Sequence, residues 1–187
     1  MGFHYFSVRA GLTRESTSKN YQYNEENAKA EDPKSRSDTF RSGALTTENF
    51  EDWSDEIKQE FKDNEMNGAI GQNLVFENDS VRVWQMALEP GERMPVLRHV
   101  CTYFWTAIEG GHFLQRTYDG TTYESESPDG ETHFYYVAEG EFALHNLENV
   151  GNKRMSFCAV ELKKESKNPL LPVKHGIQFG GKTFTCS

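Results

Sequence analysis

From residue 73 onward the sequence is a series of short apolar segments separated at regular intervals by turn-forming residues. Segments such as VRVWQMALE, TYFWTAIE and RMSFCAVELK are rich in the β-branched and aromatic residues that favour strands. Stretches such as EPGE, YDG and SPDG separate them, and Asp119-Gly120 is a strong hairpin signal because glycine supplies a positive φ. About eight strands at this spacing, with no helix between them, predict an antiparallel jelly-roll barrel rather than a parallel sheet.

Residues 1–45 have a different character, because they are polar and almost without hydrophobic periodicity. Such a segment buries too little apolar surface to offset the entropy lost on ordering it. We expect it to be either a mobile tail or an arm laid over a partner. Tyr21, Tyr23 and Phe40 are the residues that could anchor it.

Residues 46–70 are expected to form one amphipathic helix and a linker. Within TTENFEDWSDEIKQEFKDN, residues 46–64, Thr46 or Thr47 can cap the helix, and acidic residues follow. Apolar residues recur at spacings of three and four, namely Phe50, Trp53, Ile57 and Phe61. We expect this apolar stripe to lie on the outside of the main domain; a dimer contact or a lid is the alternative.

The chain of 187 residues is long enough for one domain with a substantial core and additions at its ends. We expect the all-β barrel to span residues 71–165. Residues 166–187 contain several Pro and Gly residues and are expected to form a C-terminal tail that adds an edge strand around Ile177–Phe179.

Composition excludes several classes of partner. The net charge of -9 argues against nucleic acid and against an anionic membrane surface, which both attract clustered Lys and Arg. No apolar run approaches transmembrane length. Cys101, Cys158 and Cys186 contain no CxxC pair, so reduced thiols in a cytoplasmic protein are expected rather than a zinc site or disulfides.

Several segments in order resemble the small single-domain cupins, which are RmlC-like jelly-roll barrels. They are ENDSVRVWQMALEPGE at 77–92, Arg-His followed by Tyr at 98–103, EGG at 109–111 and HNLENVGNKRMSFCAVELK at 145–163. The resemblance covers residues 73–163 and implies the fold. It does not specify an activity, because this fold hosts dioxygenases, isomerases, epimerases, storage proteins and sugar-binding regulators.

In that family, a His-x-His pair, a Glu and a later His converge on a metal, since residues two apart face the same side of a strand. Gly91 matches the glycine that opens the motif, His99 matches the second histidine, and His145 matches the later one. Leu97 replaces the first histidine, and Tyr103 stands where the Glu is expected. The motif is therefore degenerate, with two of its four ligand positions kept.

The resemblance implies a candidate site of His99, Tyr103 and His145, as metal ligands and as catalytic residues. The implied cofactor is a divalent Fe, Mn, Ni or Zn ion. Three further residues could complete the set of ligands: Glu109, His112 and His133. The alternative is that both histidines are hydrogen-bonded core residues in a barrel that has lost its metal.

A metal-free barrel that binds a small organic molecule is a further possibility. Its walls are expected to be aromatic and apolar, with candidates Trp84, Met86, Phe104, Trp105, Phe113, Tyr135 and Phe142. Arg98 joins His99, Tyr103 and His145 as a candidate polar contact. Acid–base chemistry by His99 and Tyr103, as in sugar epimerases, is a third possibility.

The expected function is therefore that of a cupin that binds a small organic molecule and acts as a metal-dependent oxygenase or isomerase. A structural or dimerising barrel without activity is the alternative. We also expect a homodimer, because a free sheet edge is a liability that a second copy can cover.

Overall fold

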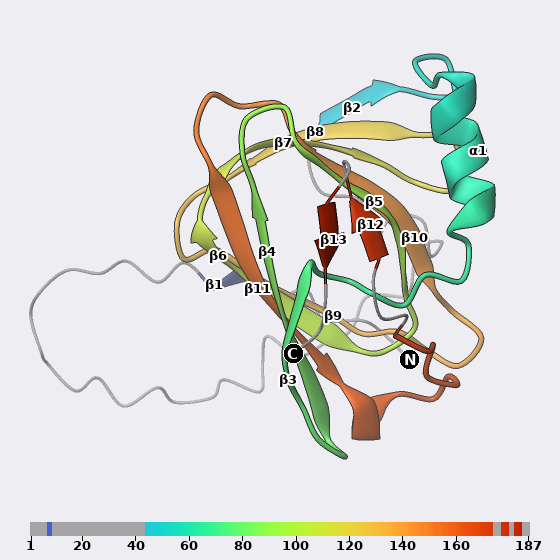
Figure 1. Ribbon diagram of the computed structural model, residues 1–187, viewed down its shortest axis with the longest axis vertical. Helices are drawn as coiled ribbons and strands as arrows, with labels where there is room; N and C mark the ends of the chain where they lie inside the picture. Colours follow the sequence, from blue (N-terminus) through green and yellow to red (C-terminus); the bar gives the residue numbers. More distant parts are fainter. Residues whose placement is uncertain (1–6, 9–43, 174–176, 180–181, 185–187) are drawn as a thin grey trace, which may run out of the picture.

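The computed structural model describes residues 7–8, 44–173, 177–179 and 182–184 (Figure 1). The expectations for Tyr21, Tyr23, Phe40 and Cys186 fall outside the described residues.

Two antiparallel sheets face each other and enclose the core (Figure 1). The six-stranded sheet contains, in spatial order, β1 (Ser7–Val8), β9 (Thr132–Tyr135), β6 (Tyr103–Glu109), β11 (Met155–Leu162), β4 (Val81–Leu88) and β3 (Asn73–Glu77). The five-stranded sheet contains β2 (Ala44–Thr47), β8 (Thr122–Ser127), β7 (Gly111–Arg116), β10 (Ala143–Asn149) and β5 (Arg93–His99). The predicted all-β jelly roll is confirmed.

The core consists of the alternate residues that each strand points between the sheets. Trp84, Leu88 and Phe157 come from the six-stranded sheet, and Leu97 and Phe113 from the five-stranded one. The alternation in TYFWTAIE predicts that the second, fourth and sixth residues share a face. The structure confirms it: all three of these residues, Tyr103, Trp105 and Ala107, point inward.

The helix α1 (Asp55–Asp63) begins later than the sequence predicted. Ser54 caps it by accepting a hydrogen bond from the Ile57 N–H, whereas Thr47 lies in β2 and pairs with Thr122 of β8. Asn49 and Phe50 explain the difference, because their positive φ angles of 56° and 63° are incompatible with a helix.

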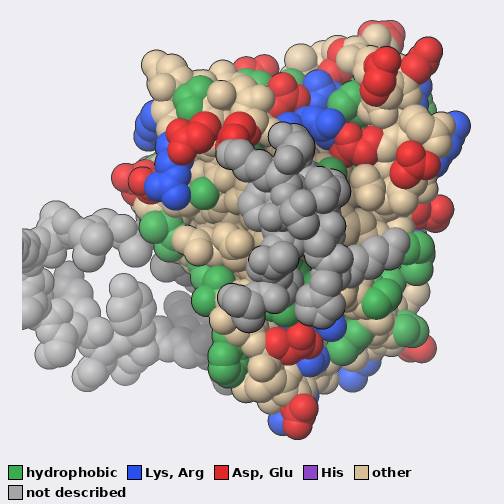
Figure 2. All heavy atoms as spheres, viewed as in Figure 1, with side chains coloured by type: hydrophobic (Ala, Val, Ile, Leu, Met, Phe, Trp, Pro, Cys, Tyr) green, Lys and Arg blue, Asp and Glu red, His purple; other side chains and the backbone are tan. Residues whose placement is uncertain are grey.

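The apolar stripe of this segment covers the outer face of the five-stranded sheet, as expected (Figure 1). Trp53 and Phe61 pack against Val96 of β5 and Leu144 of β10. Asp55, Glu56 and Asp63 of the same helix are exposed, and acidic side chains are prominent on the face shown in Figure 2.

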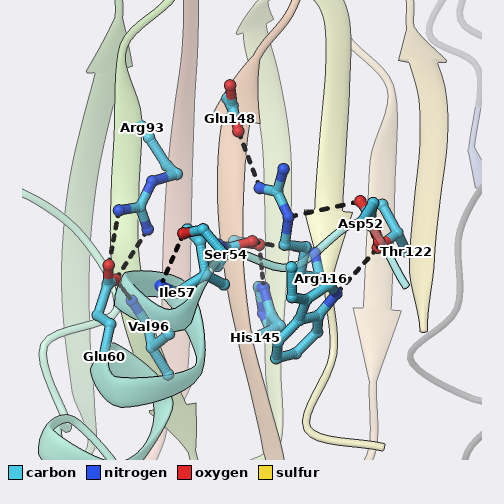
Figure 3. Close-up of polar contacts among 12 residues, drawn as sticks. Asp52, Ser54, Ile57, Glu60, Arg93, Val96, Arg116, Thr122, His145 and Glu148 are labelled. Carbon is cyan, nitrogen blue, oxygen red and sulfur yellow. Dashed lines mark hydrogen bonds and ion pairs between the residues drawn. The ribbon is translucent and has the colours of Figure 1, made fainter. Parts of the chain in front are cut away.

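Polar contacts fix the helix to the sheet (Figure 3). Glu60 accepts two hydrogen bonds from the Arg93 guanidinium, at 2.8 and 2.6 Å, and one from the Val96 N–H at 2.8 Å. Just before the helix, the Trp53 indole N–H donates to the Thr122 hydroxyl at 3.1 Å. The carboxylate of Glu60 is thus the main polar link between helix and barrel.

Two terminal segments differ in how they meet the barrel. β1 pairs with β9, so the described part of the N-terminal segment lies at a sheet edge. The strand expected around Ile177–Phe179 exists as β12, but it pairs with β13 (Lys182–Phe184) in a separate two-stranded sheet. The expectation that it adds an edge strand to the barrel is therefore wrong.

Cys101 and Cys158 are free thiols, and Cys101 is almost fully buried. Burial raises the pKa of the Cys101 thiol to about 11. Among the described residues, no helix has the length and apolar character needed to cross a membrane.

Replacing Glu60 by Ala should lower the free energy of unfolding by about 2 kcal/mol, because Arg93 and the Val96 N–H lose a partly buried charged acceptor. Urea denaturation measures the change. Gln59→Ala is the control, because Gln59 is exposed and bonds only Asp63 within its helix. Equal losses in the two variants would contradict the role of Glu60.

Candidate functional site

A cavity of about 70 Å³ lies inside the barrel, between the two sheets. Its apolar walls are formed by Ile70, Trp84, Met86, Leu97, Trp105, Phe113, Leu147, Phe157 and Ala159. Its polar lining residues are His99, Tyr103, Gln115, Tyr135 and His145. Within the described part of the chain, no Asp, Glu, Lys or Arg side chain lines it.

The structure brings His99 and His145 together at one wall of this cavity. The two residues lie on the paired strands β5 and β10, where His145 is opposite Leu97 and His99 is opposite Ala143. Their Nε2 atoms are 3.1 Å apart, and the planes of the rings differ by 14°. Residues about 46 positions apart in the chain therefore form one polar unit in an apolar interior.

The surroundings fix the tautomers of the pair. The Nδ1 of His145 lies 3.0 Å from the backbone carbonyl oxygen of Asn146, which can only accept a hydrogen bond, so Nδ1 carries the proton (Figure 3). In the neutral ring, Nε2 of His145 is then an acceptor, and His99 donates its Nε2–H to it. His99 is left with an unprotonated Nδ1, which is buried and has no hydrogen-bond partner among the described residues.

Burial keeps both imidazoles neutral. It lowers the pKa of His99 well below its ordinary value, and the neighbouring His145 lowers that pKa further. Burial also lowers the pKa of His145 to about 4, although the hydrogen bond to Asn146 opposes the shift. At neutral pH the pair is therefore uncharged, and three of its four ring nitrogens are already engaged in hydrogen bonds.

Tyr103 contacts His99 through the face of its ring. The ring centroids of His99 and Tyr103 are 3.9 Å apart, and their planes differ by 9°. Tyr135 in turn stacks on Tyr103, with ring centroids 5.0 Å apart. A metal bound by an imidazole lies in the plane of that ring. The phenol is stacked above this plane, so the arrangement does not direct its oxygen to a metal held by His99.

The donor set does not complete a metal site. No three His, Cys, Asp or Glu residues of the described segments are grouped so that they could hold an ion. Leu97, at the position of the missing histidine, lines the cavity. Binding through both Nε2 atoms would also require a proton on Nδ1 of His99, a buried atom without an acceptor among the described residues. We therefore derive no chemistry that depends on a metal.

The three additional candidate ligands lie away from the cavity. His112 pairs with Glu124 at 2.8 Å on a half-exposed surface. Glu109 pairs with Arg154 at 3.0 Å. His133 is buried, but it stacks on Trp105 and does not line the cavity.

Three other residues that were expected to line the cavity lie elsewhere. Phe104 belongs to the alternate face of β6 and does not line the cavity. Phe142 packs beside Trp53 under the helix, and the Arg98 guanidinium lies 3.7 Å from the centre of its ring. The cause is alternation: Arg98 is next to the inward His99, so it points outward.

Gln115 is a cavity residue that the sequence analysis did not identify. It is only 8% exposed and lies on β7, two residues after the inward Phe113. The sequence contains a signal for this position, because a residue two places after a core aromatic on the same strand must also face the interior.

Comparisons with known proteins bear on the fold. No family model matches the sequence, and no curated protein is significantly similar to it. A cupin domain from Bordetella pertussis is similar in structure, with 25% identity and a TM-score of 0.44, over 52% of this chain and 95% of that chain. An RmlC-like cupin family protein from Methanocaldococcus jannaschii has 15% identity and a TM-score of 0.38, over 46% and 73% of the two chains.

The two antiparallel sheets define a jelly-roll fold. A further similar structure, from Klebsiella pneumoniae, has a double-stranded β-helix domain, 17% identity and a TM-score of 0.39, over 52% of this chain and 80% of that chain. These similarities concern architecture and specify neither a ligand nor a reaction.

The free energy of unfolding should fall as the pH falls from 6.5 towards 4. The native pKa of His145 is below its unfolded value, so the unfolded state binds more protons in this window, and the loss due to His145 reaches about 3 kcal/mol by pH 4. Urea denaturation across this range measures it. His145→Gln should flatten the curve, whereas His112→Gln, on the surface, should not; identical curves for both would count against the buried neutral pair.

Proposed function

We propose that this protein binds a small organic molecule in the barrel cavity, whose wall contains the His99–His145 pair. The observation that carries the proposal is the hydrogen-bonded imidazole pair, 3.1 Å between Nε2 atoms, at the wall of an otherwise apolar cavity. Ligand sites in proteins commonly combine apolar walls with a few fixed polar groups.

The size of the cavity limits what it can enclose. Its volume is about 70 Å³, whereas a cavity that holds one water molecule needs roughly 10–15 Å³ by the same measure. A compact molecule of a few non-hydrogen atoms, or the end of a longer one, fits this space. The walls supply aromatic contact area.

Filling the cavity should abolish binding. Ala159→Leu adds three carbons to a lining position, and we expect at least a tenfold loss of affinity for any small molecule that raises the unfolding temperature of the wild type. Thermal-shift screening followed by titration measures this. Ala44→Leu, the same change at an exposed position of β2, is the control. Unchanged binding in Ala159→Leu would place the ligand elsewhere.

A divalent metal held by His99 and His145 is the second candidate, and Tyr103 remains a predicted third ligand. The observation that favours it is the distance between the Nε2 atoms, because two nitrogens at about 2.1 Å from one ion are similarly close. Such an ion would act as a Lewis acid in an oxygenase or isomerase.

Elemental analysis of untagged protein after dialysis against Fe, Mn, Ni or Zn salts tests the metal. A metal enzyme predicts about one ion per chain, lost in His99→Gln and His145→Gln but retained in His112→Gln. Because the described residues supply only two of the required donors, we expect a metal content near zero in the wild type and in all three variants.

The catalytic assignment of His99, Tyr103 and His145 stays a prediction. His99 and Tyr103 are in contact and both line the cavity, so a proton could pass between either residue and a bound molecule. The cytoplasmic location also stays a prediction.

A homodimer formed through a sheet edge stays a prediction as well. β3 is an edge strand of the six-stranded sheet, and its Val75 and Phe76 are 59% and 51% exposed. Light scattering should give twice the chain mass of 21.5 kDa. Val75→Lys should produce monomers, because an edge charge opposes pairing, whereas Val150→Lys should not. A monomeric wild type would refute the dimer.

A further inference from the structure

The amide of Gln115 is an open polar contact inside the cavity. The residue is 8% exposed and lines the cavity, yet no described residue forms a hydrogen bond with its side chain. Because Gln115 lines the cavity, a bound ligand can reach its side chain there.

Strand register places this amide close to the histidine pair. Thr117 is opposite His145, and Phe113 is opposite Asn149, so Gln115 lies between these two pairs on β7. The same inward face carries Gln115 and His145 on adjacent strands, and diagonal neighbours of this kind are within reach of long side chains. The cavity thus has one polar region, made of an amide and two imidazoles.

We propose that Gln115 makes the site selective for an uncharged ligand that carries an amide or a similar paired donor and acceptor. This inference rests on the proposed function and specifies its ligand class. A side-chain amide can give one hydrogen bond to such a group and accept another from it. The two neutral rings of the His99–His145 pair add no formal charge to the cavity wall.

The same lining disfavours an anion of equal size. No basic side chain within the described segments lines the cavity, so a carboxylate would leave water without a counter-ion. Burying an ion without a partner costs far more than burying a hydrogen-bonded neutral group. The discrimination is therefore a property of charge and hydrogen bonding rather than of shape.

Three probes with four non-hydrogen atoms each separate these effects: acetamide, acetone and acetate. Titration of the full chain at pH 7, followed by NMR of the lining side chains, gives the dissociation constants. We expect acetamide to bind in the millimolar range, acetate to bind at least tenfold more weakly, and acetone, which can only accept a hydrogen bond, to depend less on Gln115 than acetamide does.

Gln115→Leu and Gln115→Met remove the amide and keep an apolar side chain of similar length; two variants are used in case one fails to fold. Each should weaken acetamide binding at least tenfold and weaken acetone binding by a smaller factor, because acetone can form only one of the two hydrogen bonds. Gln85→Leu, on the exposed side of β4, is the matched control and should change neither.

The outcomes distinguish the two proposals. If no probe perturbs the lining residues, the proposed function fails, and this inference fails with it. If acetone and acetamide bind but acetate binds equally well, or if the Gln115 variants retain acetamide, the cavity is a binding site and only the selectivity is refuted. Preference for acetamide that disappears in both variants supports the inference.

Discussion

The burial of one face of nearly every barrel strand between two sheets governs the rest of this structure. Because side chains alternate along a strand, the choice of inward face decides at once which residues form the core and which line the cavity. In β6 this places Tyr103 and Trp105 inside and Phe104 outside. The same rule brings His99 and His145 into the interior from adjacent strands, where they must satisfy each other.

An apolar interior changes what a histidine can do. In water an imidazole gains or loses a proton near neutral pH, but here the lack of solvation favours the neutral ring. Each neutral ring has one donor and one acceptor. The Asn146 carbonyl accepts from Nδ1 of His145, so Nε2 of His145 must accept from Nε2 of His99. The site is thus defined by hydrogen-bond direction rather than by charge.

The strand pattern and the degenerate motif were sufficient to predict the jelly roll, because alternation and turn residues are local signals. They also identified His99 and His145 as a candidate pair. The start of the helix was not predictable in this way, because Phe50 continues the apolar spacing while its backbone adopts a positive φ. The inward direction was equally hard to assign at Arg98 and Phe142, since the strand limits had to be known first.

The helix α1 also affects how the chain can be divided. Composition suggests a boundary near residue 70, with the barrel as a self-sufficient unit after it. The helix packs on the barrel across this boundary, because Trp53, Ile57 and Phe61 contact the cluster of Val96 and Leu144 on the outer sheet face, together with Phe142. A fragment starting at residue 71 would expose an apolar patch on the outer face of the five-stranded sheet, on the same strands that carry the two histidines. Such a fragment would be prone to self-association.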